Sequence, residues 1–194
     1  VARAAAAAYG AGPDDPANED WRGGDADDEG DDDRDEGDRG DAAVTPAVPV
    51  GVSEEHRSFD GTMWVRPDAF RAYVNDAAAS LPAHGVDLVV FVNGHGGNVE
   101  ALAEVARRFS RDPDHDGYAV AFTWFEAVGE HAGEMGHAGP LETALLRATH
   151  PDLVREDRME SARDGASDGW GEWVSGVNLA HDAEEFTENG VVGD

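Results

Sequence analysis

The segment VVFVNGHGGN, residues 89–98, joins a run of β-branched and aromatic residues to a turn rich in glycine. The longer run VDLVVFVN, residues 86–93, predicts a fully buried strand, because its residue types favour a pleated sheet and its centre is uninterrupted by polar residues. The glycines that follow end the strand, and His95 stands among them. Because sites in parallel sheets lie at the carboxyl ends of the strands, His95 is a candidate functional residue.

Three interpretations of this loop are open on local grounds. The first is a tight turn with an incidental histidine. The second is a phosphate cradle, in which Asn98 caps the following helix and backbone N–H groups attract an anion. Its spacing matches neither G-x-G-x-x-G nor the P-loop, and the chain has no lysine. The third is a ligand site, in which the small neighbours of His95 let a metal or substrate approach.

Outward from this strand, strands alternate with helices. Pro67 opens a predicted helix, and further helices are expected over residues 99–109 and about 140–149. A second strand, YAVAFTWF, is expected over residues 118–125. This alternation predicts the α/β class, with a mostly parallel sheet covered by helices on both faces. The apolar face of the first helix is expected to comprise Phe70, Tyr73, Val74, Ala77 and Leu81.

The composition of the chain narrows the classes of function. Among 194 residues, 42 are acidic and 14 are basic, all of the latter arginine, and the net charge is −28. Nucleic acid is excluded as a partner, because phosphate binding needs a basic face. We interpret the acidity as adaptation to molar salt, where a Debye length of about 3 Å screens the repulsion between carboxylates.

The sequence also restricts the chemistry and the location of the protein. It has no cysteine, so any metal must be held by His, Asp and Glu side chains. No apolar run reaches the ~18 residues of a membrane span, and no segment resembles a signal peptide. We therefore expect a soluble cytoplasmic protein without a membrane partner.

Residues 14–41 form an acidic block, with fifteen acidic residues against three arginines. Such a block buries too little apolar surface to offset its ordering entropy, so residues 13–43 are predicted to be a disordered surface insertion. A specific calcium site is the alternative. The EF-hand pattern, D-x-[DN]-x-[DN]-G with a Glu at the twelfth position, does not fit.

Deleting residues 13–43 is expected to leave the free energy of unfolding of the core nearly unchanged. The segment has one large apolar residue, Trp21, so it has little to contribute to a core. Denaturant unfolding of the deletion variant beside the full chain checks this. Protection of the segment from proteolysis in high salt would contradict it.

A second constellation lies in GEMGHAGPLETALLRATHPDLV, residues 133–154. His137 precedes a predicted helix, and Glu142 falls in the first turn of that helix. Without other context, Glu142 is a favourable acid at the positive end of a helix and His137 is a loop residue. A functional interpretation of the pair therefore needs the rest of the sequence.

Together with a third segment, these two resemble the creatininase family of metal-dependent amidohydrolases. The resemblance rests on N-G-H-G-G-N after a strand and on H-A-G-x-x-E-T followed by a helix that ends in H-P-D-L-V. The third segment, VPVGVSEEHRSFDGTMWV (residues 48–65), looks like the family's G-x-S-x-E-H…G-T segment. The three keep the family's order and spacing across about residues 44–194.

The resemblance implies a three-layer α/β/α domain with a mostly parallel central sheet, often assembled into hexamers. It also implies two divalent metals at the strand ends (Zn²⁺, Mn²⁺ or Fe²⁺), with His95 a ligand of one metal and Glu142 a ligand of the other. His137 matches the histidine that passes a proton to the leaving nitrogen, which suits a side chain that titrates near neutrality. The implied reaction is hydrolysis of a non-peptide C–N bond, in a cyclic amide or a formamide, by metal-bound hydroxide; short peptides are substrates of other members. The glycines beside His95 would clear space around a metal.

The sequence departs from the family pattern at its beginning. The family's G-S-x-E-Q-H-G segment and the T-D that follows it, which supply a Glu, a His and a bridging Asp, are absent. The chain starts at Val1 in an alanine-rich run that looks like the helix after that motif, and it stops where relatives continue into a final helix. We therefore expect one partial creatininase-like domain over residues 1–194, with a remnant helix over 1–12, the acidic insertion over 13–43 and the α/β core over 44–194.

Other residues are expected to line the site. Glu54, Glu55 and His56 mimic the missing E-Q-H, but their position before Gly61-Thr62 aligns them with a downstream loop, so Glu55 and His56 are not expected to bind metal. Pro140 replaces an acidic residue common in relatives, so the supporting contact that this acid would make is not expected here. Trp124 is expected in the core of a strand, whereas Trp170 or Trp173 could stack on a flat small-molecule amide substrate. The remaining site-lining candidates are Asn93, Gly96, Gly97 and Asn98.

Two hypotheses of function follow. In the first, the chain belongs to a hydrolase that cleaves a small-molecule amide and assembles as a homo-oligomer. In the second, it is a catalytically inactive paralogue that only associates with full-length subunits. Two protein ligands fall short of the three or four at a zinc site, so the second hypothesis is a serious alternative. An in-frame E-Q-H…T-D segment in the DNA upstream of Val1 would favour the first.

Overall fold

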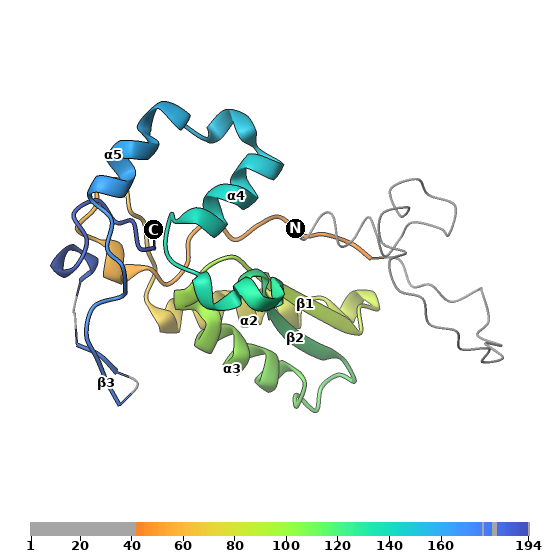
Figure 1. Ribbon diagram of the computed structural model, residues 1–194. Helices are drawn as coiled ribbons and strands as arrows, with labels where there is room; N and C mark the ends of the chain where they lie inside the picture. Colours follow the sequence, from red (N-terminus) through yellow and green to blue (C-terminus); the bar gives the residue numbers. More distant parts are fainter. Residues whose placement is uncertain (1–41, 176, 180–181, 194) are drawn as a thin grey trace. The chain divides into compact units, whose positions relative to one another are not determined.

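The computed structural model of the chain describes residues 42–175, 177–179 and 182–193. The chain divides into two compact units, Val1–Val48 and Pro49–Asp194. The helices and strands among the described residues all belong to the second unit (Figure 1). The helix predicted over 1–12 and almost all of the acidic segment predicted over 13–43 lie outside the described residues.

The second unit contains a β-α-β motif built on the glycine loop. Strand β1 (Leu88–Asn93) leads through this loop into helix α3 (Val99–Phe109), and the chain returns in strand β2 (Tyr118–Thr123) (Figure 1). The two strands pair in parallel, with a register that places Asn93 beside Thr123. Both strands therefore end at the same edge of the sheet, which confirms the predicted α/β class and the helix over 99–109.

Helix α2 (Pro67–Ala79) and α3 supply the core together with one face of the sheet. Helix α2 buries Phe70, Val74 and Ala78, a stripe at intervals of four residues. Tyr73 is 61% exposed and Ala77 is exposed, so the prediction that these two residues belong to the apolar face is wrong. The buried residues are their neighbours Val74 and Ala78. The buried residues form two clusters, Phe70, Val74, Ala101, Leu102 and Val105, and Ala78, Val89, Ala106, Phe109 and Ala119.

The other face of the β1–β2 sheet is exposed within the described residues. Its side chains come from alternate positions of both strands: Leu88, Val90, Tyr118, Val120 and Phe122. The prediction that β1 is fully buried is therefore wrong for the described part of the chain. The physical reason is that α2 and α3 contribute buried residues to one face of this sheet only.

Strand β2 is shorter than predicted. It ends at Thr123, because that residue pairs with Asn93, the last residue of β1, before the partner strand turns into the glycine loop. Trp124 begins a 3₁₀ helix (Trp124–Ala127) and is half-buried. It is therefore not the core residue of a strand that the sequence predicted.

The remaining elements follow the β-α-β motif along the chain. Helix α4 (Pro140–Thr149) has the bounds predicted for it and begins with a proline at its first position. A short helix, α5 (Met159–Asp164), precedes an antiparallel hairpin of β3 (Trp173–Val174) and β4 (Val177–Asn178). In the described part of the chain, no helix combines the length and the apolar character needed to span a bilayer.

Candidate active site

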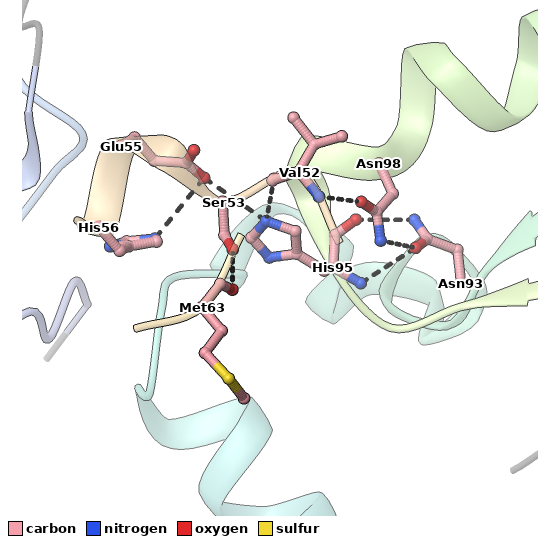
Figure 2. Close-up of polar contacts among 8 residues, drawn as sticks. All are labelled: Val52, Ser53, Glu55, His56, Met63, Asn93, His95 and Asn98. Atoms are coloured by element: carbon pink, nitrogen blue, oxygen red, sulfur yellow. Dashed lines mark hydrogen bonds and ion pairs between the residues drawn. The ribbon is translucent and has the colours of Figure 1, made fainter. Parts of the chain in front are cut away.

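Asn93 ties the glycine loop to the end of the sheet. Its side chain is 3% exposed. Its Nδ2 donates to the backbone carbonyl of His95 at 2.8 Å and to Thr123 Oγ1 at 3.3 Å. Its Oδ1 accepts from the backbone N–H of His95 at 3.2 Å and from Asn98 Nδ2 at 3.3 Å. The last residue of β1 therefore holds the shape of the loop that follows it (Figure 2).

Asn98 joins the loop to a distant segment. It directly precedes α3, yet its side chain makes no capping bond to that helix, so the capping role considered for it is wrong. Instead, Asn98 Oδ1 accepts from the backbone N–H of Val52 at 2.9 Å. A Cβ at Gly51 would lie 2.6 Å from the same oxygen, so glycine is needed there for this approach. Asn98 thus brings Val52 next to His95 (Figure 2).

His95 contacts this segment directly. Its Nε2 lies 2.8 Å from the carbonyl oxygen of Val52 and 3.5 Å from Glu55 Oε1. The interaction with Glu55 raises the pKa of His95; burial opposes the rise, while the Val52 carbonyl and the charges of Glu55 and Glu142 add to it. Its Nε2 therefore donates to acceptors of the protein itself.

One of the three glycines around His95 has a clear steric role. A Cβ at Gly97 would lie 2.2 Å from the Val52 carbonyl oxygen and 2.7 Å from His95 Nε2. Gly94 and Gly96 have no heavy atom within 4 Å of the corresponding position. Gly97 therefore lets the backbone at Val52 approach the histidine, while the predicted clearance around a metal stays a prediction.

Replacing Gly97 by alanine is expected to lower the free energy of unfolding by about 1–3 kcal/mol, because the new methyl group overlaps the carbonyl oxygen of Val52, a residue whose N–H is bonded to Asn98. Gly96→Ala is the matched control, since its Cβ meets open space; a change within about 0.5 kcal/mol is expected there. Urea unfolding of both variants checks the difference. Equal midpoints would refute the steric role of Gly97.

Glu55 and His56 complete this part of the site from a 3₁₀ helix, η2 (Glu54–His56). Glu55 Oε1 lies 3.7 Å from His56 Nε2 as well as 3.5 Å from His95 Nε2, so one carboxylate faces two imidazoles (Figure 2). Burial by itself raises the pKa of Glu55, but its hydrogen bonds with His95 and the backbone and the two imidazoles together lower it. The structure therefore brings both residues beside His95, whereas their lining of a substrate site stays a prediction.

His137 enters the site from the chain just before α4. Its backbone exchanges two hydrogen bonds with Val192, at 2.8 and 2.9 Å, in an antiparallel bridge. A Cβ at Gly136 would overlap the carbonyl group of Val192, so this bridge requires glycine before the histidine. The ring of His137 stacks on that of His56, with centroids 4.1 Å apart and planes 18° from parallel.

Burial is the main electrostatic influence on these two rings. It lowers the pKa of His56, and the neighbouring His137 and His95 act in the same direction, while Glu55 opposes them. It also lowers the pKa of His137, against the opposing charges of Glu142 and Glu55. Both rings are therefore biased toward the neutral form, which can accept a proton.

Glu142 lies in the first turn of α4 and accepts a hydrogen bond from the backbone N–H of Ala138. This bond fixes the carboxylate over the residue that follows His137. Its charge acts on the pKa of both His137 and His95. The carboxylate thus belongs to the electrostatic surroundings of both histidines, and its metal-binding role stays a prediction.

The two candidate tryptophans differ in their surroundings. The Trp170 ring lies 6.5 Å from that of His56 and 6.3 Å from that of His137, edge-on to the latter. Trp173 is 56% exposed in β3.

Sequence reasoning missed the Val52 carbonyl, because a backbone acceptor leaves no trace in residue identity. It also missed Thr123, although its place at the end of the paired strand could have indicated it.

The resemblance to the creatininase family implies a centre with two metals, each held by protein side chains. Within residues 42–175, 177–179 and 182–193, no three His, Asp or Glu side chains form a group able to hold a metal ion. His95 Nε2 is bonded to the Val52 carbonyl, and Glu142 accepts from a backbone N–H. The described residues therefore do not fit such a centre by themselves.

The parallel β-α-β motif places His95 just beyond the end of β1, and comparison with known proteins identifies the family of the chain. The family model described as creatininase, creatinine amidohydrolase, matches residues 26–194. The chain therefore belongs to the creatininase family.

Curated relatives carry two different names. The mycofactocin precursor peptide peptidase of Mycobacterium ulcerans is 36% identical over 118 residues, which cover 61% of this chain and 44% of that protein. The protein of the same name from Mycolicibacterium smegmatis is 35% identical over 127 residues, with the same coverage. The creatinine amidohydrolase of Pseudomonas putida is 28% identical over 139 residues, 61% of this chain and 54% of that protein. The chain thus spans about half the length of these relatives.

A solved structure shows the same fold. The crystal structure of a creatinine amidohydrolase superimposes with a TM-score of 0.51 at 23% sequence identity, over 76% of this chain and 64% of that chain. At this identity the likeness establishes the creatininase-like fold alone.

Proposed function

We propose that this chain provides the His95, His137 and Glu142 part of a metal-dependent amidohydrolase site that cleaves an amide C–N bond. Its family membership supports hydrolysis. The described residues do not hold two metals by themselves, so the proposal requires further ligands, of the kind that the family's E-Q-H…T-D residues supply.

The chain's own residues suit the handling of a proton at the leaving nitrogen. His137 is held by the Val192 bridge, and burial biases its imidazole toward the neutral form. A neutral imidazole accepts a proton and, once charged, donates it; a lowered pKa makes the charged form the stronger acid. His137 is accordingly the proposed donor to the departing nitrogen.

The gathering of three histidine rings is the observation that supports this proposal most strongly. The three histidines that the sequence singled out come from residues 56, 95 and 137, yet their rings gather: His56 lies 4.1 Å from His137 and 6.4 Å from His95, centroid to centroid. Glu55 faces two of the rings, and the charge of Glu142 favours a higher pKa of both His95 and His137. Such a concentration of titratable groups is characteristic of catalytic sites.

Two substrate classes are in question. The first is a non-peptide amide, either cyclic or a formamide, as the creatinine amidohydrolase relative suggests. A short modified peptide is the second candidate, and one observation favours it: the peptidase relatives are 36% and 35% identical, against 28% for the amidohydrolase. The homo-oligomer that the family resemblance implies is part of the same proposal.

An assay on a completed protein tests the function. An N-terminal segment carrying E-Q-H…T-D from a relative is joined ahead of Val1, and the chimera is supplied with Zn²⁺, Mn²⁺ or Fe²⁺. Creatinine, a formylated amine and a short peptide are then compared by the appearance of their hydrolysis products, which are the ring-opened acid for creatinine and a free amine for the other two. Cleavage of at least one is expected. Cleavage of none, by a folded chimera with bound metal, would favour the inactive paralogue instead.

A further inference from the structure

His56 is buried without the hydrogen bonds that a buried imidazole requires. It is 5% exposed, and neither Nδ1 nor Nε2 has a hydrogen-bond partner within the described residues. A buried polar group left in this state costs about 1–3 kcal/mol relative to one that is satisfied. An apolar residue would avoid that cost, so the ring calls for a specific explanation.

The contact made by the flat face of the His56 ring explains why this ring is buried. It lies almost parallel to the His137 ring, at 18° and 4.1 Å, which is the separation of rings in direct contact. Trp170 lies beside both rings, at 59° to His56 and 63° to His137. The backbone of His137 is fixed by Val192, and the stacked ring constrains the one freedom left, the rotation of the side chain.

The edge of His56 points in a second useful direction. Its Nε2 lies 3.7 Å from Glu55 Oε1, and that oxygen lies 3.5 Å from His95 Nε2 (Figure 2). The dipeptide Glu55-His56 therefore lies between the histidine of the glycine loop and the histidine before α4.

We propose that His56 is a positioning residue for His137: its stacked face holds the plane of that imidazole, and its edge on Glu55 sets that plane relative to His95. The proposal deepens the proposed function, since it concerns the histidine assigned there to proton transfer. Positioning of this kind matters because a displacement of about 1 Å at a reacting group can cost a hundredfold in rate.

Three variants of the full chain separate the face from the edge. His56→Phe keeps a flat ring and loses both nitrogens, His56→Asn keeps a polar edge and loses the ring, and His56→Ala loses both. His115→Ala is the matched control, since His115 also lies against an aromatic ring, that of Phe109, with centroids 4.2 Å apart and planes 40° from parallel. Circular dichroism and thermal unfolding establish that each variant is folded.

The readout is the NMR signal of the His137 ring in histidine-labelled chain, assigned through His137→Asn. In the unaltered chain it is expected as one narrow signal, shifted upfield by the ring current of His56. His56→Ala and His56→Asn are expected to lose that shift and to broaden or split the signal. His56→Phe is expected to retain a single shifted signal, and His115→Ala to leave it unchanged.

Each outcome decides the proposal. If His56→Asn preserves the signal and His56→Phe abolishes it, the ring nitrogens act through a ligand or water, and the stacking role is wrong. If no variant changes the signal, His56 is a structural residue only. Should His56→Ala fail to fold, the Phe and Asn variants still decide. The readout needs no hydrolysis, so an inactive chimera with these signal changes would refute the proposed function and leave the positioning role intact.

Discussion

Expressed alone from Val1 to Asp194, the chain is expected to bind divalent metal weakly and to hydrolyse no amide at a measurable rate. Zinc sites use three or four protein ligands, and the described residues provide no group of three. His95 and Glu142 are in addition bonded to backbone groups of the protein. Calorimetric titration after chelator treatment measures the binding. Tight binding of two metals per chain would show that the site is complete without further ligands.

In the chimera with an E-Q-H…T-D segment, metal binding and activity are expected to return together. His95→Ala in that chimera should lower kcat/KM by at least about a thousandfold, because the variant lacks the proposed metal ligand that the glycine loop holds in place. His84→Ala is the matched control, as His84 is an exposed histidine in the turn after α2. A His95→Ala chimera that stays active would refute the ligand role.

The second large effect is expected at His137. Replacing it by asparagine in the chimera should lower kcat by about 10²–10⁴-fold, the usual contribution of a general acid or base, with little change in KM. Steady-state kinetics with the best substrate of the panel measure both constants. His150→Asn, at the exposed end of α4, is the control and should leave both unchanged.

A different result at His137 would be equally informative. A rise in KM at constant kcat would mean that His137 binds substrate and transfers no proton. Metal content of the variant, measured by elemental analysis, separates either result from the loss of a metal. An unchanged kcat at full metal content would rule out the proposed role.

Local sequence signals predicted the elements that depend on local chemistry. The glycine loop after β1, the start of α4 at Pro140 and the full extent of α3 were all readable, since each is set by a proline, a glycine run or an amphipathic stripe within a few residues. The end of β2 was not. It is set by where its partner β1 stops, which is a long-range property.

The site shows the same division. His95, His137 and Glu142 stood out because their residue types and spacing match a family pattern. The stacking of His56 on His137 was unpredictable, since the two are 81 residues apart and their contact depends on the bridge from His137 to Val192. The sequence likewise could not indicate that Asn98 binds Val52 in preference to capping α3, because both bonds suit an asparagine.

The hydrogen bonds of Asn93 also bear on the chemical ageing of the protein. Asn-Gly sequences lose ammonia when the glycine nitrogen attacks the asparagine carboxamide, and Asn93-Gly94 has this sequence. Here the carboxamide is buried and bonded through both its oxygen and its nitrogen, so it is not free to rotate toward that nitrogen. Conversion to aspartate would also set an acceptor against the carbonyl oxygen of His95, where a donor now lies. The folded loop therefore protects Asn93-Gly94 from deamidation, and deamidation would in turn break a hydrogen bond that holds the loop.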